Sequence, residues 1–250
     1  SVDGIAGQAT YNKINKLLGG KTTSATANKN YQILRPDKQT TIVKIPHSQI
    51  DKAGVVIANT KSKRETLGSM QKRTGYDFII NGGLYWTDSK TGISHPLNLL
   101  FSNNSQVTAG KYSRFCLMTY KDKSYKFDWY KWTKETMDII GGSPSLVVNG
   151  KINIDKGVMD GGLITARHPR SAIGLDENYF YLVTIDGRRP NQGMRGMTIN
   201  ELARYMQSIG CTDAINLDGG GSTRLMYKQT VLNKALENRP VQDAVGIKLK

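Results

Sequence analysis

The alternation of apolar and polar residues predicts a chain built mainly from short β-strands. Six runs rich in β-branched and aromatic residues fit strands, and the polar segment 121–124 separates two of them as a hairpin turn. Residues 169–186 form a further hairpin pattern that turns at 176–178, and its second half, 179–185, is apolar enough for the centre of a sheet. The six runs are 41–46, 54–59, 77–81, 115–120, 125–130 and 145–148.

One helix has both a start and a stop signal. Thr198 stands at the N-cap position, Glu201 follows three residues later as in a capping box, and Gly210 follows the last apolar residue. Leu202, Tyr205, Met206 and Ile209 recur between them at helical spacing. No internal repeat is present. The pattern predicts an α+β domain with a mixed, mainly antiparallel β-sheet core and a few flanking helices.

The N-terminal part differs from this pattern. Residues 8–18 fit a short helix, and residues 19–30 are small and polar throughout, which predicts a flexible linker. The segment from Val2 to Ile14 resembles the closing half of a peptidoglycan-binding repeat, which implies a cell-wall context for the parent protein; an unrelated helix is the alternative. We therefore expect three parts: a repeat edge at 1–18, a linker at 19–30 and the main domain at 31–250.

Composition narrows the class of protein. The chain has 250 residues, of which 38% are hydrophobic and 22% charged, a balance that fits a soluble globular protein rather than a disordered one. No apolar run approaches the roughly 18 residues that a membrane span needs. Two cysteines frame neither a disulfide scaffold nor a zinc site.

The net charge of +15 predicts attraction to polyanions, among them nucleic acid, anionic cell-wall polymers and acidic membranes. Eight of the twelve arginines follow Asp160, but only four of the 23 lysines do. Arginine suits bidentate recognition of phosphate or carboxylate, so we expect an anionic ligand in this part; chance clustering or structural bridges are the alternatives. The chain lacks a basic helix, a zinc finger and a ribonucleoprotein motif, which argues against a nucleic-acid partner.

Candidate chemistry gathers where predicted strands end. Asp218 closes an apolar run and shares a strand face with Asn216. Gly219, Gly220 and Gly221 follow, and glycines let backbone amides come close to a ligand. Ser222 and Thr223 add hydroxyls. The alternative for this motif is a loose hairpin turn.

Three other segments repeat this theme. Asp186 ends the predicted central strand and is followed by Gly187 and Arg188, so it is a candidate acid or base; a structural bridge to an arginine is the alternative. Arg167 and Arg170 flank His168 and could straddle a phosphate, with His168 as a positioning residue. Asn81 and Gly82 precede Tyr85 and Trp86, which suit stacking on a sugar ring or else cover the core edge.

Taken together, these motifs resemble the phosphodiester glycosidase family. They occur in the family's order and span most of the chain after Tyr31. The chain departs from the family after Asn81-Gly82-Gly83, where a bulkier aromatic residue is usual. The matching segments are Asn81-Gly82-Gly83, Gly141-Gly142-Ser143-Pro144, the run 167–174 that opens Arg167-His168-Pro169-Arg170, Asp186-Gly187-Arg188, Gly196-Met197-Thr198, the run 216–222 from Asn216 to Ser222, and Arg239-Pro240-Val241.

The resemblance implies hydrolysis of the glycosidic bond of a sugar-1-phosphodiester similar to an N-acetylglucosamine-1-phosphodiester. On this basis we expect Asp218 and Asp186 to be the catalytic carboxylates. A divalent cation, Ca²⁺ or Mg²⁺, is an alternative device for the same Asp and Asn oxygens, although no metal ligands are assigned. The expected substrate-binding residues are Asn81, Gly82, Arg167, His168, Arg170, Arg188, Asn216, Gly219, Gly220, Gly221, Ser222 and Thr223.

The repeat edge and the positive charge favour a cell-envelope glycopolymer such as teichoic acid as substrate, and a secreted or phage-encoded protein that works outside the cell or at the wall. Two other functions stay open at this point. One is a non-catalytic protein that binds anionic cell-wall polymers through salt-sensitive contacts. The other is a phosphodiesterase that cuts the P–O bond on the other side of the bridge.

Overall fold

The computed structural model describes residues 26–28, 30–110, 115–155 and 161–250. Its largest element is an eight-stranded sheet in the order β1-β2-β3-β16-β15-β17-β13-β14. These strands are β1 (Thr26–Asn28), β2 (Tyr31–Leu34), β3 (Thr40–Pro46), β13 (Ser145–Val148), β14 (Lys151–Ile152), β15 (Arg170–Leu175), β16 (Tyr179–Ile185) and β17 (Asp213–Asn216).

Two five-stranded sheets and one hairpin complete the β-structure. The first sheet has the order β11-β10-β12-β8-β9, from β8 (Leu100–Ser102), β9 (Ser105–Thr108), β10 (Phe115–Tyr120), β11 (Tyr125–Trp129) and β12 (Thr136–Gly141). The second has the order β19-β18-β5-β20-β4, from β4 (Ile50–Ile57), β5 (Phe78–Asn81), β18 (Leu225–Tyr227), β19 (Thr230–Val231) and β20 (Asp243–Leu249). The hairpin joins β6 (Tyr85–Thr87) and β7 (Ser94–Pro96).

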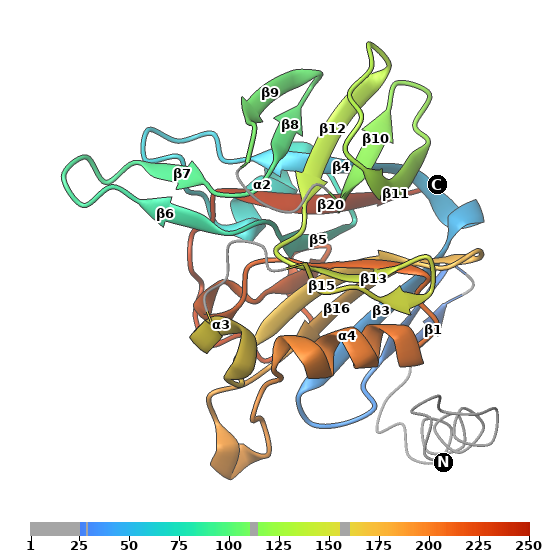
Figure 1. The fold of residues 1–250 in the computed structure, drawn as a ribbon, viewed down its shortest axis with the longest axis vertical. Helices are drawn as coiled ribbons and strands as arrows, with labels where there is room; N and C mark the ends of the chain where they lie inside the picture. The colour runs from blue at the N-terminus through green and yellow to red at the C-terminus, as the bar shows by residue number, and fades with distance from the viewer. Residues whose placement is uncertain (1–25, 29, 111–114, 156–160) are drawn as a thin grey trace.

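The eight-stranded sheet forms one layer and the five-stranded sheets form the other (Figure 1). The main core fills the space between them, because alternate residues of each strand point inward. Phe180 and Leu182 of β16 pack there against Phe78 of β5 and Val245 of β20. The intervening residue of β16, Tyr181, faces the opposite side, so both faces of this central strand are buried.

In the described part of the chain, three short helices and three 3-10 turns lie outside these layers. Helix α4 (Ile199–Ser208) covers the outer face of the eight-stranded sheet, where its apolar side chains form a second core with β16 and β17 (Figure 1). Helix α2 (Leu67–Thr74) covers the second five-stranded sheet. The others are α3 (Gly161–Thr165), η1 (His47–Gln49), η2 (Pro190–Gln192) and η3 (Gly220–Ser222).

Most predicted elements are confirmed within one or two residues. The runs 115–120 and 145–148 are β10 and β13, and the hairpin 169–186 is formed by β15 and β16. The helix begins after Thr198 with a complete capping box, as its sequence indicates. The strand predicted at 54–59 begins earlier in the structure. It is β4, which starts at Ile50 because this residue pairs with Leu249 of β20.

The mainly antiparallel core is confirmed, and two details of the predicted fold class change. Every strand pairing among the described residues is antiparallel, so the sheet is not mixed there. The helices are few and short, so the domain is mainly β. The proposed repeat edge at 1–18 lies outside the described residues, and residues 26–28 of the expected linker form β1, which pairs with β2.

Candidate active site

Residues far apart in the chain meet where β5 and β17 end and β20 begins. Asn81, the last residue of β5, is fully buried and ties these ends together. Its Nδ2 donates to the Asp218 carbonyl at 2.7 Å, and its Oδ1 accepts from the Ser171 hydroxyl at 2.7 Å. The Asp218 amide in turn donates to the Gly82 carbonyl at 2.9 Å. Asn81 therefore fixes the backbone around Asp218.

The Asp218 carboxylate is half-buried and accepts a hydrogen bond from the Gly219 amide at 2.9 Å. Burial raises the pKa of Asp218 to about 6, against the opposing influence of the Ser222 hydroxyl, the Gly219 amide and the charge of Arg239. A carboxyl group with this pKa gains and loses its proton close to neutral pH. That property suits a general acid or base.

A second carboxylate lies beside it, on the first residue of β20. Asp243 is 2% exposed, and its Oδ1 accepts from the Gly83 amide at 2.7 Å. Burial raises the pKa of Asp243 to about 7, and the nearby charge of Asp218 adds to this rise. Because a Cβ on Gly82 would lie 1.7 Å from the Asp243 Oδ1, only glycine leaves room for this carboxylate. The two aspartates thus form an interacting pair that titrates close to neutral pH.

A cavity of about 590 Å³ opens over Asp218. Tyr85 lines it and donates from its hydroxyl to the Pro240 carbonyl at 3.1 Å. Burial and the charge of Asp218 raise the pKa of Tyr85, so its phenol stays protonated and can donate. The other lining residues are Arg64, Thr87, Glu237, Asn238 and Arg239.

The glycine loop after Asp218 is packed on several sides. A Cβ on Gly221 would lie 1.9 Å from the Glu237 carboxylate and 2.5 Å from the Arg239 guanidinium, so glycine lets this ion pair close over the loop. Gly220 has φ +60, a conformation that glycine adopts without strain. Ser222 and Thr223 follow and are buried.

Arg188 approaches the same loop at Gly220. Its Nη2 lies 3.4 Å from the Nδ1 of His168, and a Cβ on Gly220 would lie 3.2 Å from this guanidinium. Burial, followed by the charges of Arg170 and Arg188, lowers the pKa of His168. Gly219 is held against Pro169, because its Cβ would lie 2.5 Å from the Pro169 carbonyl oxygen. The segment formed by His168 and Pro169 therefore packs against the glycine loop, together with Arg188.

The sequence model of the phosphodiester glycosidase family matches residues 74–248, well over half of the chain. This chain belongs to the phosphodiester glycosidase family. The predicted resemblance to this family is confirmed. Membership of this family implies a hydrolase of phosphodiester glycosides. All residues that line the cavity except Arg64 lie inside the matched region.

Solved structures share the fold of this chain. The catalytic domain of zebrafish N-acetylglucosamine-1-phosphodiester alpha-N-acetylglucosaminidase, auto-inhibited by its pro-peptide, superposes with a TM-score of 0.68 at 19% identity, over 88% of this chain and 78% of that one. A hypothetical protein from Synechocystis superposes with a TM-score of 0.62 at 16% identity, over 91% of this chain and 61% of that one.

A sequence relative comes from a prophage. The SPbeta prophage-derived uncharacterized protein YomE of Bacillus subtilis strain 168 is 31% identical over 87 residues, which are 34% of this chain. The matched part is 13% of the length of YomE, so this chain matches a small part of that relative.

Several residues singled out in the sequence are held inside the fold instead of facing the cavity. Arg170 is 2% exposed, and its guanidinium donates to the carbonyls of Leu163, Ala166 and Met197 at 2.7 to 2.9 Å. Asn216 is 1% exposed and donates to the Ser143 carbonyl. These contacts give both residues an architectural role.

Arg167 and Asp186 also have partners within the protein. Arg167 forms an exposed ion pair with Glu201 and donates to the Gly196 carbonyl at 3.1 Å. Asp186 is 3% exposed, and its two carboxylate oxygens accept from the Asn233 side chain and the Lys234 amide, each at 2.8 Å. Among the predicted site residues, the structure therefore brings Asp218 to the cavity and holds Asp186 away from it.

The sequence analysis gave no role to Arg239 and Arg64, which line the cavity, or to Asp243, which is buried beside Asp218. A signal for Asp243 exists, because it stands two residues after the family segment Arg239-Pro240-Val241 and opens an apolar run. Arg64 has no such signal, since it lies before the matched region in a polar loop. Within the described ranges, no group of three or more His, Cys, Asp or Glu side chains is arranged to hold a metal ion.

Proposed function

We propose that this chain hydrolyses the glycosidic bond of a sugar-1-phosphodiester at the cavity lined by Asp218. The observation that carries the proposal is the interacting pair of Asp218 and Asp243, whose pKa values of about 6 and about 7 lie close to neutral. Burying two carboxyl groups side by side lowers the stability of the folded protein. Such pairs are typical of functional sites. Family membership makes the phosphodiester glycoside the best-supported substrate class.

In the proposed reaction, a water oxygen forms a bond to the anomeric carbon of the sugar. The bond from that carbon to the bridging oxygen breaks, and its electron pair leaves with the phosphate. Asp218 faces the cavity and takes the proton of the attacking water. Asp243 is buried beside it, and the charge of Asp218 raises the pKa of Asp243, so the two carboxyl groups titrate together.

Arg239 is the group best placed for the leaving phosphate. It lines the cavity, and its charge already acts on Asp218. A guanidinium stabilises the negative charge that develops on the phosphate oxygens, so the leaving group needs little protonation. The Tyr85 hydroxyl donates its one proton to the Pro240 carbonyl, so its oxygen can accept a hydrogen bond from a sugar hydroxyl in the cavity. This assignment gives Arg239 the role that the sequence suggested for Arg167, Arg170 and Arg188.

For the biological substrate, we propose a phosphate-containing glycopolymer of the cell envelope, such as teichoic acid, cleaved outside the cell or at the wall. The net charge of +15 supports an anionic polymer, and the prophage relative supports a phage-encoded or secreted origin. The described helices include none that is both long and apolar enough to cross a membrane.

The test is to incubate the wild-type protein and Asp218→Asn with a panel of sugar-1-phosphodiesters and wall polymers, and to measure released reducing sugar. Release by the wild type and its loss in the variant support the proposal. Binding of a wall polymer without release would favour the rival function, a non-catalytic wall-binding protein. That rival also predicts that binding weakens steeply with salt.

A further inference from the structure

The cavity contains a second arginine that the proposed reaction does not use. Arg64 lines it together with Tyr85 and Arg239, and its charge lowers the pKa of the Tyr85 phenol. Arg239 acts on the reacting carboxylate, because its charge lowers the pKa of Asp218. Arg64 brings a second guanidinium to the same cavity.

The guanidinium of Arg64 is available to a ligand. Within the described part of the chain no carboxylate lies within ion-pair distance of it, and its Nε is buried without a hydrogen-bond partner. Its neighbours differ in this respect. Arg73 is paired with the buried Glu65 at 2.7 Å, and Arg239 is paired with Glu237 at 2.7 Å. Because no carboxylate of the described residues neutralises Arg64, the terminal nitrogens of its guanidinium can bind an anion in the cavity.

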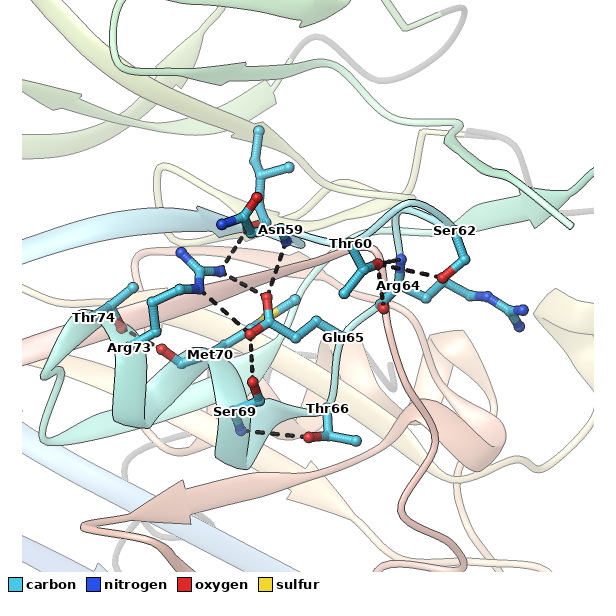
Figure 2. A network of polar contacts seen from close by, with 11 residues as sticks. Asn59, Thr60, Ser62, Arg64, Glu65, Thr66, Ser69, Met70, Arg73 and Thr74 are labelled. Atoms are coloured by element: carbon cyan, nitrogen blue, oxygen red, sulfur yellow. Dashed lines mark hydrogen bonds and ion pairs between the residues drawn. The ribbon is translucent and has the colours of Figure 1, made fainter.

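The loop that carries Arg64 is rigidly held (Figure 2). The Thr60 hydroxyl accepts from the Arg64 amide at 3.1 Å and donates to the Arg64 carbonyl at 2.8 Å. Glu65 is 7% exposed and accepts from the Arg73 guanidinium, the Ser69 hydroxyl and the Asn59 amide. Figure 2 shows the Arg64 side chain extending away from this cluster.

The same loop is joined to the strand that leads to Asp243. The Glu65 amide donates to the Val241 carbonyl at 2.8 Å, and the Val241 amide donates to the Glu65 carbonyl at 2.9 Å. Arg64 is thus positioned relative to Arg239 and Asp243 by backbone hydrogen bonds. The backbone that carries the Arg64 side chain is therefore fixed beside the cavity before a ligand binds. The family match begins at residue 74, so this loop belongs to a part of the chain outside the shared region.

We propose that Arg64 binds a second phosphate of the substrate, beyond the phosphate at the scissile bond, and so selects phosphate-repeating polymers over single phosphodiesters. The inference rests on the proposed function for the position of the first phosphate, at Arg239. The fork of guanidinium donors matches phosphate oxygens, and the cavity of about 590 Å³ extends from Asp218 to Arg64.

The test compares two probes that contain no glycosidic bond, so that binding is measured without turnover. One is diglycerol phosphate, with a single phosphodiester, and the other is a glycerol phosphate oligomer with two phosphodiesters. Isothermal titration calorimetry gives the dissociation constants for the wild type, Arg64→Gln, Arg64→Lys and the control Lys61→Gln. Lys61 is exposed in the same loop and does not line the cavity, so its variant removes an equal charge nearby.

We expect the wild type and Lys61→Gln to bind the two-phosphate probe at least about tenfold more tightly than the one-phosphate probe. Arg64→Gln should bring the two affinities within about twofold, and Arg64→Lys should retain part of the preference. The inference is overturned if the wild type shows no preference, if both Arg64 variants keep it in full, or if Arg64→Gln weakens both probes equally. A protein that shows the preference but releases no sugar would refute the proposed function and leave the anion site standing.

Discussion

In the eight-stranded sheet, β16 and β17 are each followed closely by an aspartate and a glycine. The two carboxylates nevertheless have different hydrogen-bond partners and different access to the cavity. At the end of β16, both oxygens of Asp186 accept hydrogen bonds from residues 233 and 234. Beyond β17, Asp218 accepts one bond from its own loop and faces a cavity. The segment between β19 and β20 makes the difference, because it saturates Asp186 with Asn233 and Lys234 and provides Glu237 and Arg239 to the cavity. The role of a carboxylate at a strand end therefore depends on the hydrogen-bond donors that a loop distant in the sequence brings to it.

The largest expected effect comes from Asp218→Asn. The asparagine Oδ1 can still accept from the Gly219 amide, so the fold should persist, but the side chain can no longer take a proton. We expect kcat to fall by about 10²–10⁴. Because burial raises the pKa of Asp218 to about 6, the neutral replacement should leave the protein at least as stable as the wild type at neutral pH. The measurement is released sugar against time, with circular dichroism as the folding control. Near wild-type turnover would remove Asp218 from the mechanism.

Asp243→Asn should change how stability depends on pH. In the folded protein the pKa of Asp243 is raised to about 7 from an ordinary value of 3.8. Between about pH 4 and 7 the folded state therefore holds more protons than the unfolded state, and the free energy of unfolding decreases as pH rises. The variant cannot ionise, so at pH 8 it should be more stable than the wild type by about 4 kcal/mol.

Urea unfolding at pH 4 and pH 8 measures this difference. The two proteins should have nearly equal stability at pH 4, where the wild-type carboxyl is protonated. A variant that is less stable at both pH values would mean that the carboxylate of Asp243 stabilises the fold, contrary to the account.

Gly82→Ala tests whether the space beside Asp243 is required. The added methyl group would lie 1.7 Å from the Asp243 Oδ1, so either the strand or the carboxylate must move. We expect a loss of about 2 kcal/mol in the free energy of unfolding and reduced turnover. The matched control is Gly83→Ala, whose Cβ would meet Asn98 at 3.4 Å, an ordinary contact distance. Equal stability of the two variants would contradict the packing described for Asp243.

The smallest effect is expected at the other strand end. In Asp186→Asn, one acceptor oxygen becomes an amide nitrogen, which cannot accept from Asn233 or the Lys234 amide. We expect a loss of about 1 kcal/mol in stability and a kcat within about threefold of the wild type. Thermal unfolding and the sugar-release assay check both halves. A large fall in kcat without loss of stability would place Asp186 in the chemistry and reverse the comparison.

The sequence predicted local features better than the site. The capping box at Thr198 and the hairpin of β15 and β16 depend on residues close together in the chain. Their patterns can therefore be recognised in the sequence alone. Asp218 was identified because it follows an apolar strand and precedes glycines. Asp243 was missed because its significance arises from the pairing of β20 with β5, which sets Ala244 opposite Asn81. Arg170 resembled a phosphate ligand until the carbonyls around it were known.

The central claim is that water attacks the sugar carbon of a sugar-1-phosphodiester at Asp218. The most direct measurement is turnover in ¹⁸O-labelled water, followed by mass spectrometry of the two products. The account predicts that the label enters the released sugar and is absent from the phosphomonoester. Label found in the phosphate would show cleavage of the P–O bond and contradict the account.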